Sequence, residues 1–221
     1  YTDFTKSFFK NIIRNHESEG VDFWWIDWQQ HLTSNDTYGL SETFWCNHIF
    51  FNDMVRKRTD RRPVIFHRWG GLGSHRYQIG FSGDALINFQ TLGFQPYFTA
   101  TASNVGYGYW GHDLGGHAFT DESIVNDPEL VLRWIQFGVF TPIFRTHATN
   151  DARIERRIWK FDNFPTMLEA VRLRYSLFPY LYTMARKAYD TGISVCRPLY
   201  YEYPESEEAY VYENEYFFGD D

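Results

Sequence analysis

The stretch that decides the fold is Val21-Asp22-Phe23-Trp24-Trp25-Ile26-Asp27, a short apolar segment that ends in a carboxylate. Its length and bulky side chains are typical of a buried β-strand. Immediately before it, apolar residues recur at helical spacing from about Thr5 to Glu19, and Gly20 is placed to end that helix. A helix that leads directly into a buried strand with a polar end predicts an α/β protein.

The same alternation continues along the chain. Further strands are expected over Pro63–Phe66 and Phe140–Phe144, and further helices over Glu42–Arg58, from Pro128 to about Phe137, and over about Pro165–Tyr189. Asp127 is placed to cap the second of these helices, and Gly192 to end the third. Strands that alternate with helices predict a parallel sheet with crossover connections.

Polar residues collect after each predicted strand, which is the end where (β/α)8 barrels keep their chemistry. No Gly-x-Gly-x-x-Gly motif follows a strand, so a dinucleotide-binding fold is disfavoured. The chain has 221 residues, fewer than the roughly 250 typical of such a barrel. We therefore expect an incomplete (β/α)8 barrel, without its first strands, over residues 1–196. Residues 197–221 are expected to form a junction and the start of a distal β-sandwich domain.

The composition narrows the range of partners. Acidic residues outnumber basic ones by 28 to 21, a formal net charge of −7, and no basic run supports binding to nucleic acid. No apolar stretch approaches the roughly 20 residues that cross a bilayer, so a membrane partner is not expected. Cys46 and Cys196 suggest neither a disulfide framework nor a CxxC metal site. Aromatic residues make up 20% of the chain, enough to fill a core and also line a sugar site.

Two aspartates are the strongest candidates for chemistry. Asp27 ends the Trp-rich strand, where a carboxylate among aromatic rings is costly unless it is hydrogen-bonded or functional. Asp84 ends the segment Gly80–Asp84 after the next strand. Taken singly, Asp27 could open a loop and Asp84 could cap a helix. Taken together, two carboxylates at the ends of adjacent parallel strands can face one pocket, as the cleavage of a glycosidic bond requires.

At this point the sequence resembles glycoside hydrolase family 31, the α-glucosidase and α-xylosidase group. The likeness covers nearly the whole chain. It comprises the strand Trp25-Ile26-Asp27, then Arg68, Arg76-Tyr77 and Gly83-Asp84, the loop Gly111-His112-Asp113-Leu114-Gly115-Gly116, the block from Glu129-Leu130 through Arg133-Trp134 and Gln136-Phe137-Gly138 to Arg145-Thr146-His147, and Arg197-Pro198-Leu199. Each piece alone is a weak signal, but five in the right order are a strong one.

The resemblance implies a retaining exo-α-glycosidase that needs no cofactor and no metal, with a glycoside or oligosaccharide as its substrate. By this likeness Asp27 is the nucleophile and Asp84 is the general acid/base. Arg68 and His147 would hydrogen-bond the hydroxyls of the sugar, and Asp113 would do the same or orient that arginine. Aromatic side chains would wall the pocket, namely Trp25, Trp28 and Phe81.

The chain departs from the usual family pattern at several positions. Trp28-Gln29-Gln30 stands where many members have Met-Asn-Glu, Phe81 where Trp is common, Ala85 where Asn is common, and His117 where Phe is usual. The substrate is therefore left open between an α-glucoside and an α-galactoside or α-N-acetylgalactosaminide.

Two interpretations of other kinds remain. A metal-dependent hydrolase could use His112, Asp113, His117 and His147, whose side chains offer nitrogen and oxygen ligands. A barrel of the same fold could instead bind carbohydrate without turnover.

Overall fold

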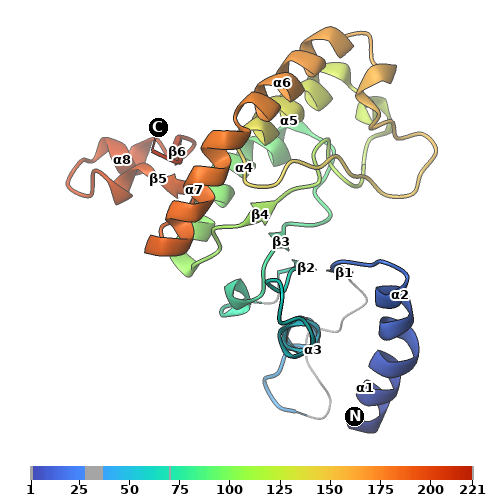
Figure 1. The fold of residues 1–221 in the computed structure, drawn as a ribbon. Coiled ribbons are helices and arrows are strands. Elements are labelled where there is room, and N and C mark those ends of the chain that lie inside the picture. Colours follow the sequence, from blue (N-terminus) through green and yellow to red (C-terminus); the bar gives the residue numbers. More distant parts are fainter. Residues whose placement is uncertain (1, 28–36, 70, 221) are drawn as a thin grey trace.

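The computed structural model describes residues 2–27, 37–69 and 71–220 (Figure 1). Its first helical stretch consists of α1 (Thr2–Phe8), a π-helical turn (Phe9–Ile13) and α2 (Arg14–Ser18). Gly20 then takes a positive φ of 113°, a conformation that glycine adopts without steric cost. The first predicted helix is thus confirmed. The strand that follows, β1, is shorter than expected and covers Trp24–Ile26.

A parallel sheet organises the described residues. It has four strands in the order β1-β2-β3-β4, with β2 over Ile65–Arg68, β3 over Gly80–Phe81 and β4 over Trp110–Gly111. Every neighbouring pair is parallel, with Trp25 opposite Phe66 and Arg68 opposite Phe81. Only glycine fits at Gly80, because a Cβ there would lie 2.3 Å from the Tyr107 ring. The predicted parallel sheet is confirmed.

Helices flank this sheet. In the view of Figure 1, α1–α3 gather below the strands and α4–α7 above them. Side-chain caps begin three of them: Ser41 accepts from the Phe44 amide at α3 (Glu42–Lys57), Asn88 from the Thr91 amide at α4 (Phe89–Thr101), and Asp127 from the Glu129 and Leu130 amides at α5 (Pro128–Val139). The short 3₁₀ turns cover Ser74–Arg76, Ala102–Val105, Glu122–Ile124, Ile158–Lys160 and Leu199–Tyr201. No helix in the described ranges is both long and apolar enough to cross a membrane.

The helix expected over Pro165–Tyr189 is wrong in one respect, since it consists of two helices. The first is α6 (Phe164–Ser176), the second is α7 (Phe178–Thr191), and Leu177 lies between them. Pro179 explains the break, because it has no amide hydrogen to donate to the carbonyl of the preceding turn and is well tolerated only in the first turn of a helix. Gly192, with a φ of 77°, ends α7 as predicted.

The strand expected over Phe140–Phe144 is also wrong. The segment runs beside β4, since the Ile143 amide donates to the Trp110 carbonyl at 3.2 Å, but no regular strand forms. Pro142 cannot donate to a ladder. The Arg174 guanidinium binds the carbonyls of Val139, Thr141 and Pro142, which a strand would otherwise use. A single parallel bridge forms slightly further on, between Leu114 and Thr146.

The C-terminal segment forms a separate small sheet. Strand β5 (Cys196–Pro198) pairs antiparallel with β6 (Tyr216–Phe218), and the short helix α8 (Glu208–Val211) lies between them in the chain. The sheet packs on α7 through a cluster that includes Met184 and Val195. The domain boundary expected between residues 196 and 197 falls inside β5.

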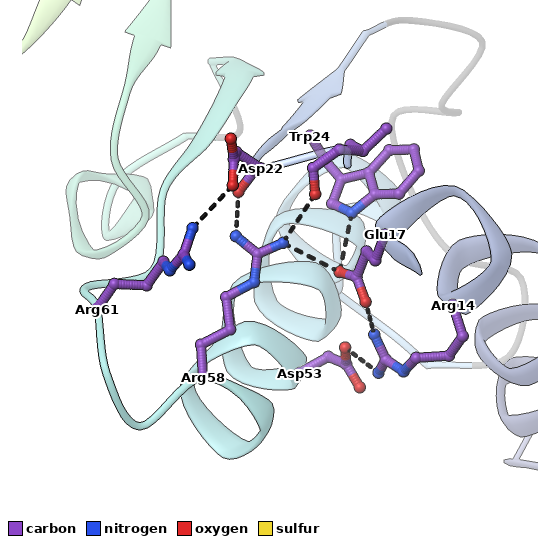
Figure 2. Close-up of polar contacts among 8 residues, drawn as sticks. Arg14, Glu17, Asp22, Trp24, Asp53, Arg58 and Arg61 are labelled. Atoms are coloured by element: carbon purple, nitrogen blue, oxygen red, sulfur yellow. Dashed lines mark hydrogen bonds and ion pairs between the residues drawn. The ribbon is translucent and has the colours of Figure 1, made fainter. Parts of the chain in front are cut away.

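An ionic network ties the first helices to α3 and β1 (Figure 2). Arg14 binds both Glu17 and Asp53, and Arg58 reaches Glu17 at 3.4 Å. The Trp24 indole N–H donates at 3.3 Å to Glu17 Oε1, the same oxygen that Arg58 contacts. These groups are largely covered, so the network is screened less by solvent than an exposed ion pair would be.

Candidate active site

The alternation of side chains along each strand decides which residues reach the site. Ile26 and Ile65 point toward α3, where they pack with Met54 and Tyr77. Trp25 points to the opposite face of the sheet, where it packs against two other rings. Its ring centre lies 5.9 Å from that of Phe66 and 5.9 Å from that of Phe81. Because side chains alternate between the two faces of a strand, Asp27, two residues after Trp25, lies on the same face as Trp25. The carboxyl ends of the parallel strands are where barrel enzymes hold their reactive groups.

Arg68, at the end of β2, joins the two candidate aspartates. Its Nε donates to Asp27 Oδ1 at 2.6 Å, and its Nη2 donates to Asp84 Oδ1 at 2.8 Å. Gly83 permits this approach, because a Cβ there would lie 2.3 Å from Arg68 Nη1. The expectation that the aspartates follow adjacent strands is wrong: Asp27 follows β1 and Asp84 follows β3, and β2 lies between them. Arg68 reaches both because it is on that central strand.

Asp113 lies just beyond β4 and orients an arginine, but that arginine is Arg145 rather than Arg68. Arg145 Nη2 donates to Asp113 Oδ1, and the Asp113 side chain is only 1% exposed. Burial raises the pKa of Asp113 to about 6, although the adjacent Arg145 opposes the rise. The Arg145 guanidinium stacks 5.2 Å from the Trp25 ring centre and 5.4 Å from that of Phe81.

Arg145 is the residue that sequence reasoning missed. It belongs to the Arg-Thr-His motif, and Thr146 makes the bridge to Leu114. Because side chains alternate about a paired position, Arg145 and His147 point to the same side. That alternation was a signal in the sequence that could have identified it.

The aromatic residues play different parts. Trp25 is 43% exposed and contacts the His147 ring, with ring centres 5.4 Å apart. Phe81 is 1% exposed, so the expectation that it walls the pocket is wrong. It lies beneath Arg68 and Arg145, with each guanidinium 5.4 Å from its ring centre. Trp28, the third expected wall residue, lies outside the described residues.

The histidines separate into two groups. His112 is fully buried, and its two ring nitrogens contact the hydroxyls of Ser82 at 3.0 Å and Thr99 at 2.7 Å, so it faces the core rather than the site. Burial lowers the pKa of His112 to about 3. His147 faces the site, and burial followed by the nearby Arg145 lowers its pKa to about 4. His117 Nε2 lies 3.7 Å from Asp84 Oδ1.

Of the metal ligands weighed from the sequence, three come together. Asp113, His117 and His147 each offer a ligand atom, and these atoms all lie within 4.8 Å of one another. His112 is not part of this group.

A parallel α/β sheet that brings two aspartates together at the carboxyl ends of its strands has the arrangement expected of a barrel glycosidase. The chain belongs to glycosyl hydrolase family 31: residues 1–184 match the "Glycosyl hydrolases family 31 TIM-barrel domain". The match confirms the predicted α/β TIM-barrel fold.

Individual relatives agree with this assignment. The chain is 35% identical over 185 residues to the probable glucan 1,3-alpha-glucosidase of Oryza sativa subsp. japonica, covering 82% of this chain and 19% of the relative. A GH31 alpha-xylosidase from a soil metagenome, solved with xylose, superposes with a TM-score of 0.81 at 27% identity, covering 96% of this chain and 36% of that one. A GH31 sulfoquinovosidase from E. rectale, solved with an aza-sugar inhibitor, gives 0.78 at 30% identity, with coverages of 97% and 34%. The chain therefore spans less than two-fifths of each of these proteins.

Proposed function

We propose that the protein is a retaining exo-α-glycosidase that hydrolyses O-glycosidic bonds at the non-reducing end of α-linked saccharides. The observation that carries the proposal is the bridge from Arg68 to both Asp27 and Asp84. One guanidinium holds both carboxylates at the carboxyl ends of the strands. Retaining glycosidases need their two carboxyl groups close together, about 5–5.5 Å apart.

In the proposed mechanism Asp27 attacks the anomeric carbon. A bond forms between a carboxylate oxygen and that carbon while the bond to the leaving oxygen breaks, and Asp84 gives its proton to that oxygen. In the second step Asp84 takes a proton from water, whose oxygen displaces Asp27 from the sugar. The two inversions give a product with the configuration of the substrate.

The residues around the aspartates are proposed to hold the sugar. Arg68 and His147 would donate to its hydroxyls, and Trp25 and Trp28 would offer rings for its apolar face. Asp113, which binds Arg145, would act through that arginine. Arg145 in turn would present the donors that Asp113 leaves free.

The substrate class is proposed from the relatives. Their names include a glucan 1,3-alpha-glucosidase, an alpha-xylosidase and a sulfoquinovosidase, so sugars of the gluco configuration are favoured. We propose an α-glucoside first and an α-galactoside or α-N-acetylgalactosaminide second.

A panel of aryl α-glycosides tests this proposal on the full-length protein. The gluco, xylo, galacto, N-acetylgalactosamino and sulfoquinovo substrates would be compared by kcat/KM. NMR of the first product would report the anomer. We expect turnover of at least one α-glycoside with the α anomer released first. Release of the β anomer would exclude a retaining mechanism, and binding without turnover would favour a silent carbohydrate-binding barrel.

The acid/base role of Asp84 has its own test. Asp84→Ala should lose most activity on glycosides with poor leaving groups, because those oxygens need a proton to depart. It should retain far more on activated aryl glycosides, for which hydrolysis of the covalent intermediate becomes limiting. Asp220→Ala, an exposed aspartate that contacts Lys187, is the matched control and should behave as wild type. Equal losses on both substrate types would contradict the role.

A further inference from the structure

Three residues that could ligate a metal meet beside Asp84. Asp113 follows β4, His117 ends the same glycine-containing loop, and His147 follows the bridge at Thr146. Their ligand atoms lie within 4.8 Å of one another, although His147 is 30 residues or more from the other two. The rings of His117 and His147 are 5.3 Å apart between centres, with planes inclined by 32°.

Two atoms of this group lack hydrogen-bond partners among the described residues. These are Asp113 Oδ2 and His117 Nδ1, both buried, and they lie 3.5 Å from each other. A buried polar atom without a partner is costly, and each such atom calls for an explanation. A cation placed between the carboxylate oxygen and the ring nitrogen would satisfy both.

The neighbouring charges favour a dication. The carboxylates of Asp27, Asp84 and Asp113 lie in ion-pair contact with the guanidinium groups of Arg68 and Arg145. When these five side chains are all ionised, their formal charges sum to −1. A group of two imidazoles and one carboxylate is a donor set that Zn²⁺ accepts, and three protein ligands leave a fourth position open.

The other contacts of the ligands resemble those of metal sites. Metal-bound histidines use their second nitrogen to contact a carboxylate, and bound carboxylates are themselves hydrogen-bonded. Here His117 Nε2 lies 3.7 Å from Asp84, and Asp113 Oδ1 accepts from Arg145. With bonds of about 2.0–2.1 Å, ligand atoms around tetrahedral zinc lie about 3.3 Å apart, so binding needs a closure of about 1.5 Å at most.

We propose that Asp113, His117 and His147 form a zinc-binding site in the pocket and that its occupation inhibits the enzyme. The binding step stands without the proposed activity, whereas the inhibition rests on it. Zn²⁺ would take His147 away from the sugar and fix His117 against Asp84. It would also occupy the space that the sugar hydroxyls need, so the inhibition should be competitive with substrate.

Calorimetric titration of ZnCl₂ into the metal-free, full-length protein tests the binding step directly. We expect a saturable site of one equivalent in the wild type, and His117→Phe, which keeps an aromatic ring but removes both ligand nitrogens, should weaken it. Loss of a ligand should cost at least about 100-fold in affinity, the upper end of what is lost when a residue that merely supports a ligand is changed. His16→Ala is the control, since the side chain of His16 is exposed and lies beside Glu19 and the Trp24 ring, away from the site.

Two further measurements keep the proposal testable if His117→Phe folds poorly. His147→Ala removes another ligand and should weaken zinc to a similar extent. Co²⁺ should give visible absorption bands in the wild type that are absent in either variant. Zinc should then raise the KM for an aryl glycoside without changing kcat. Equal zinc affinity in the wild type and both ligand variants would overturn the site. Binding that is retained without any effect on KM would overturn the inhibition alone.

Discussion

At the scale of single residues, Arg68 explains why two aspartates from different strands share one site. Its planar guanidinium donates in two directions, to Asp27 and to Asp84. The sequence indicated both aspartates through the family motifs, and Arg68 as a sugar-binding residue. It could not indicate that Arg68 bridges them, because that depends on β2 lying between β1 and β3.

We expect Arg68→Lys to lower kcat/KM by at least about 100-fold, because an ammonium is a point charge that cannot bind both carboxylates with a fixed fork. The circular dichroism spectrum should stay that of the wild type. Arg157→Lys is the matched control, since Arg157 is exposed and forms an ion pair with Glu155. Retention of more than a third of the wild-type kcat/KM by Arg68→Lys would contradict the account.

His112 makes a prediction about stability and pH. Its pKa is lowered from 6.5 to about 3 in the folded protein, because burial disfavours the charged ring. The stability this provides is complete above pH 6.5, where neither state is protonated. It is lost as pH falls toward about 3, since the unfolded chain takes up the proton first. By pH 4.5 the loss should be about 2–3 kcal/mol, at 1.36 kcal/mol per unit.

Urea unfolding at pH 7.5 and pH 4.5 measures this term. His112→Gln has no proton to gain and keeps groups able to bond Ser82 and Thr99. Its free energy of unfolding should therefore decrease between pH 7.5 and pH 4.5 by about 2–3 kcal/mol less than that of the wild type. For His16→Gln, at an exposed helical position, the free energy of unfolding should decrease between the two pH values as much as it does in the wild type. An unchanged decrease in His112→Gln would show that this ring is not the source.

At the scale of elements, the sequence predicted helices better than strands. Caps such as Asp127 and the terminating Gly192 act locally, so helix ends could be read from neighbouring residues. The segment Phe140–Phe144 looked like a strand because it is apolar. Its backbone instead binds Arg174, a residue about 30 positions away, and no local pattern predicts that contact.

Arg174 should therefore be important for the fold next to the site. Arg174→Met leaves the carbonyls of Val139, Thr141 and Pro142 without their donor, and unsatisfied buried groups cost about 1–3 kcal/mol each. We expect the free energy of unfolding to decrease by about 3 kcal/mol or more, as measured by urea denaturation. Arg172→Met, an exposed neighbour on α6, should change it by less than about 0.5 kcal/mol. Similar values for the two variants would contradict this role.

At the scale of the whole molecule, family membership and the parallel order of the strands were both accessible from the sequence. The ordered motifs indicated the family, and the alternation of helices and strands predicted the parallel sheet. The choice among sugars was not accessible, because it depends on the walls of the pocket. There Phe81 proved to be covered by arginines, and His117 lies beside Asp84.

The central claim is that Asp27 is the nucleophile of a retaining α-glycosidase. The most direct measurement is the turnover of an activated aryl α-glycoside by full-length Asp27→Ala, with and without azide. We expect wild-type turnover to be lost without azide. Added azide should restore part of it and yield a β-glycosyl azide, because the small anion fills the space left by the carboxylate and attacks from the same face. Substantial turnover by Asp27→Ala in the absence of azide, or an α-glycosyl azide as the product, would contradict the claim.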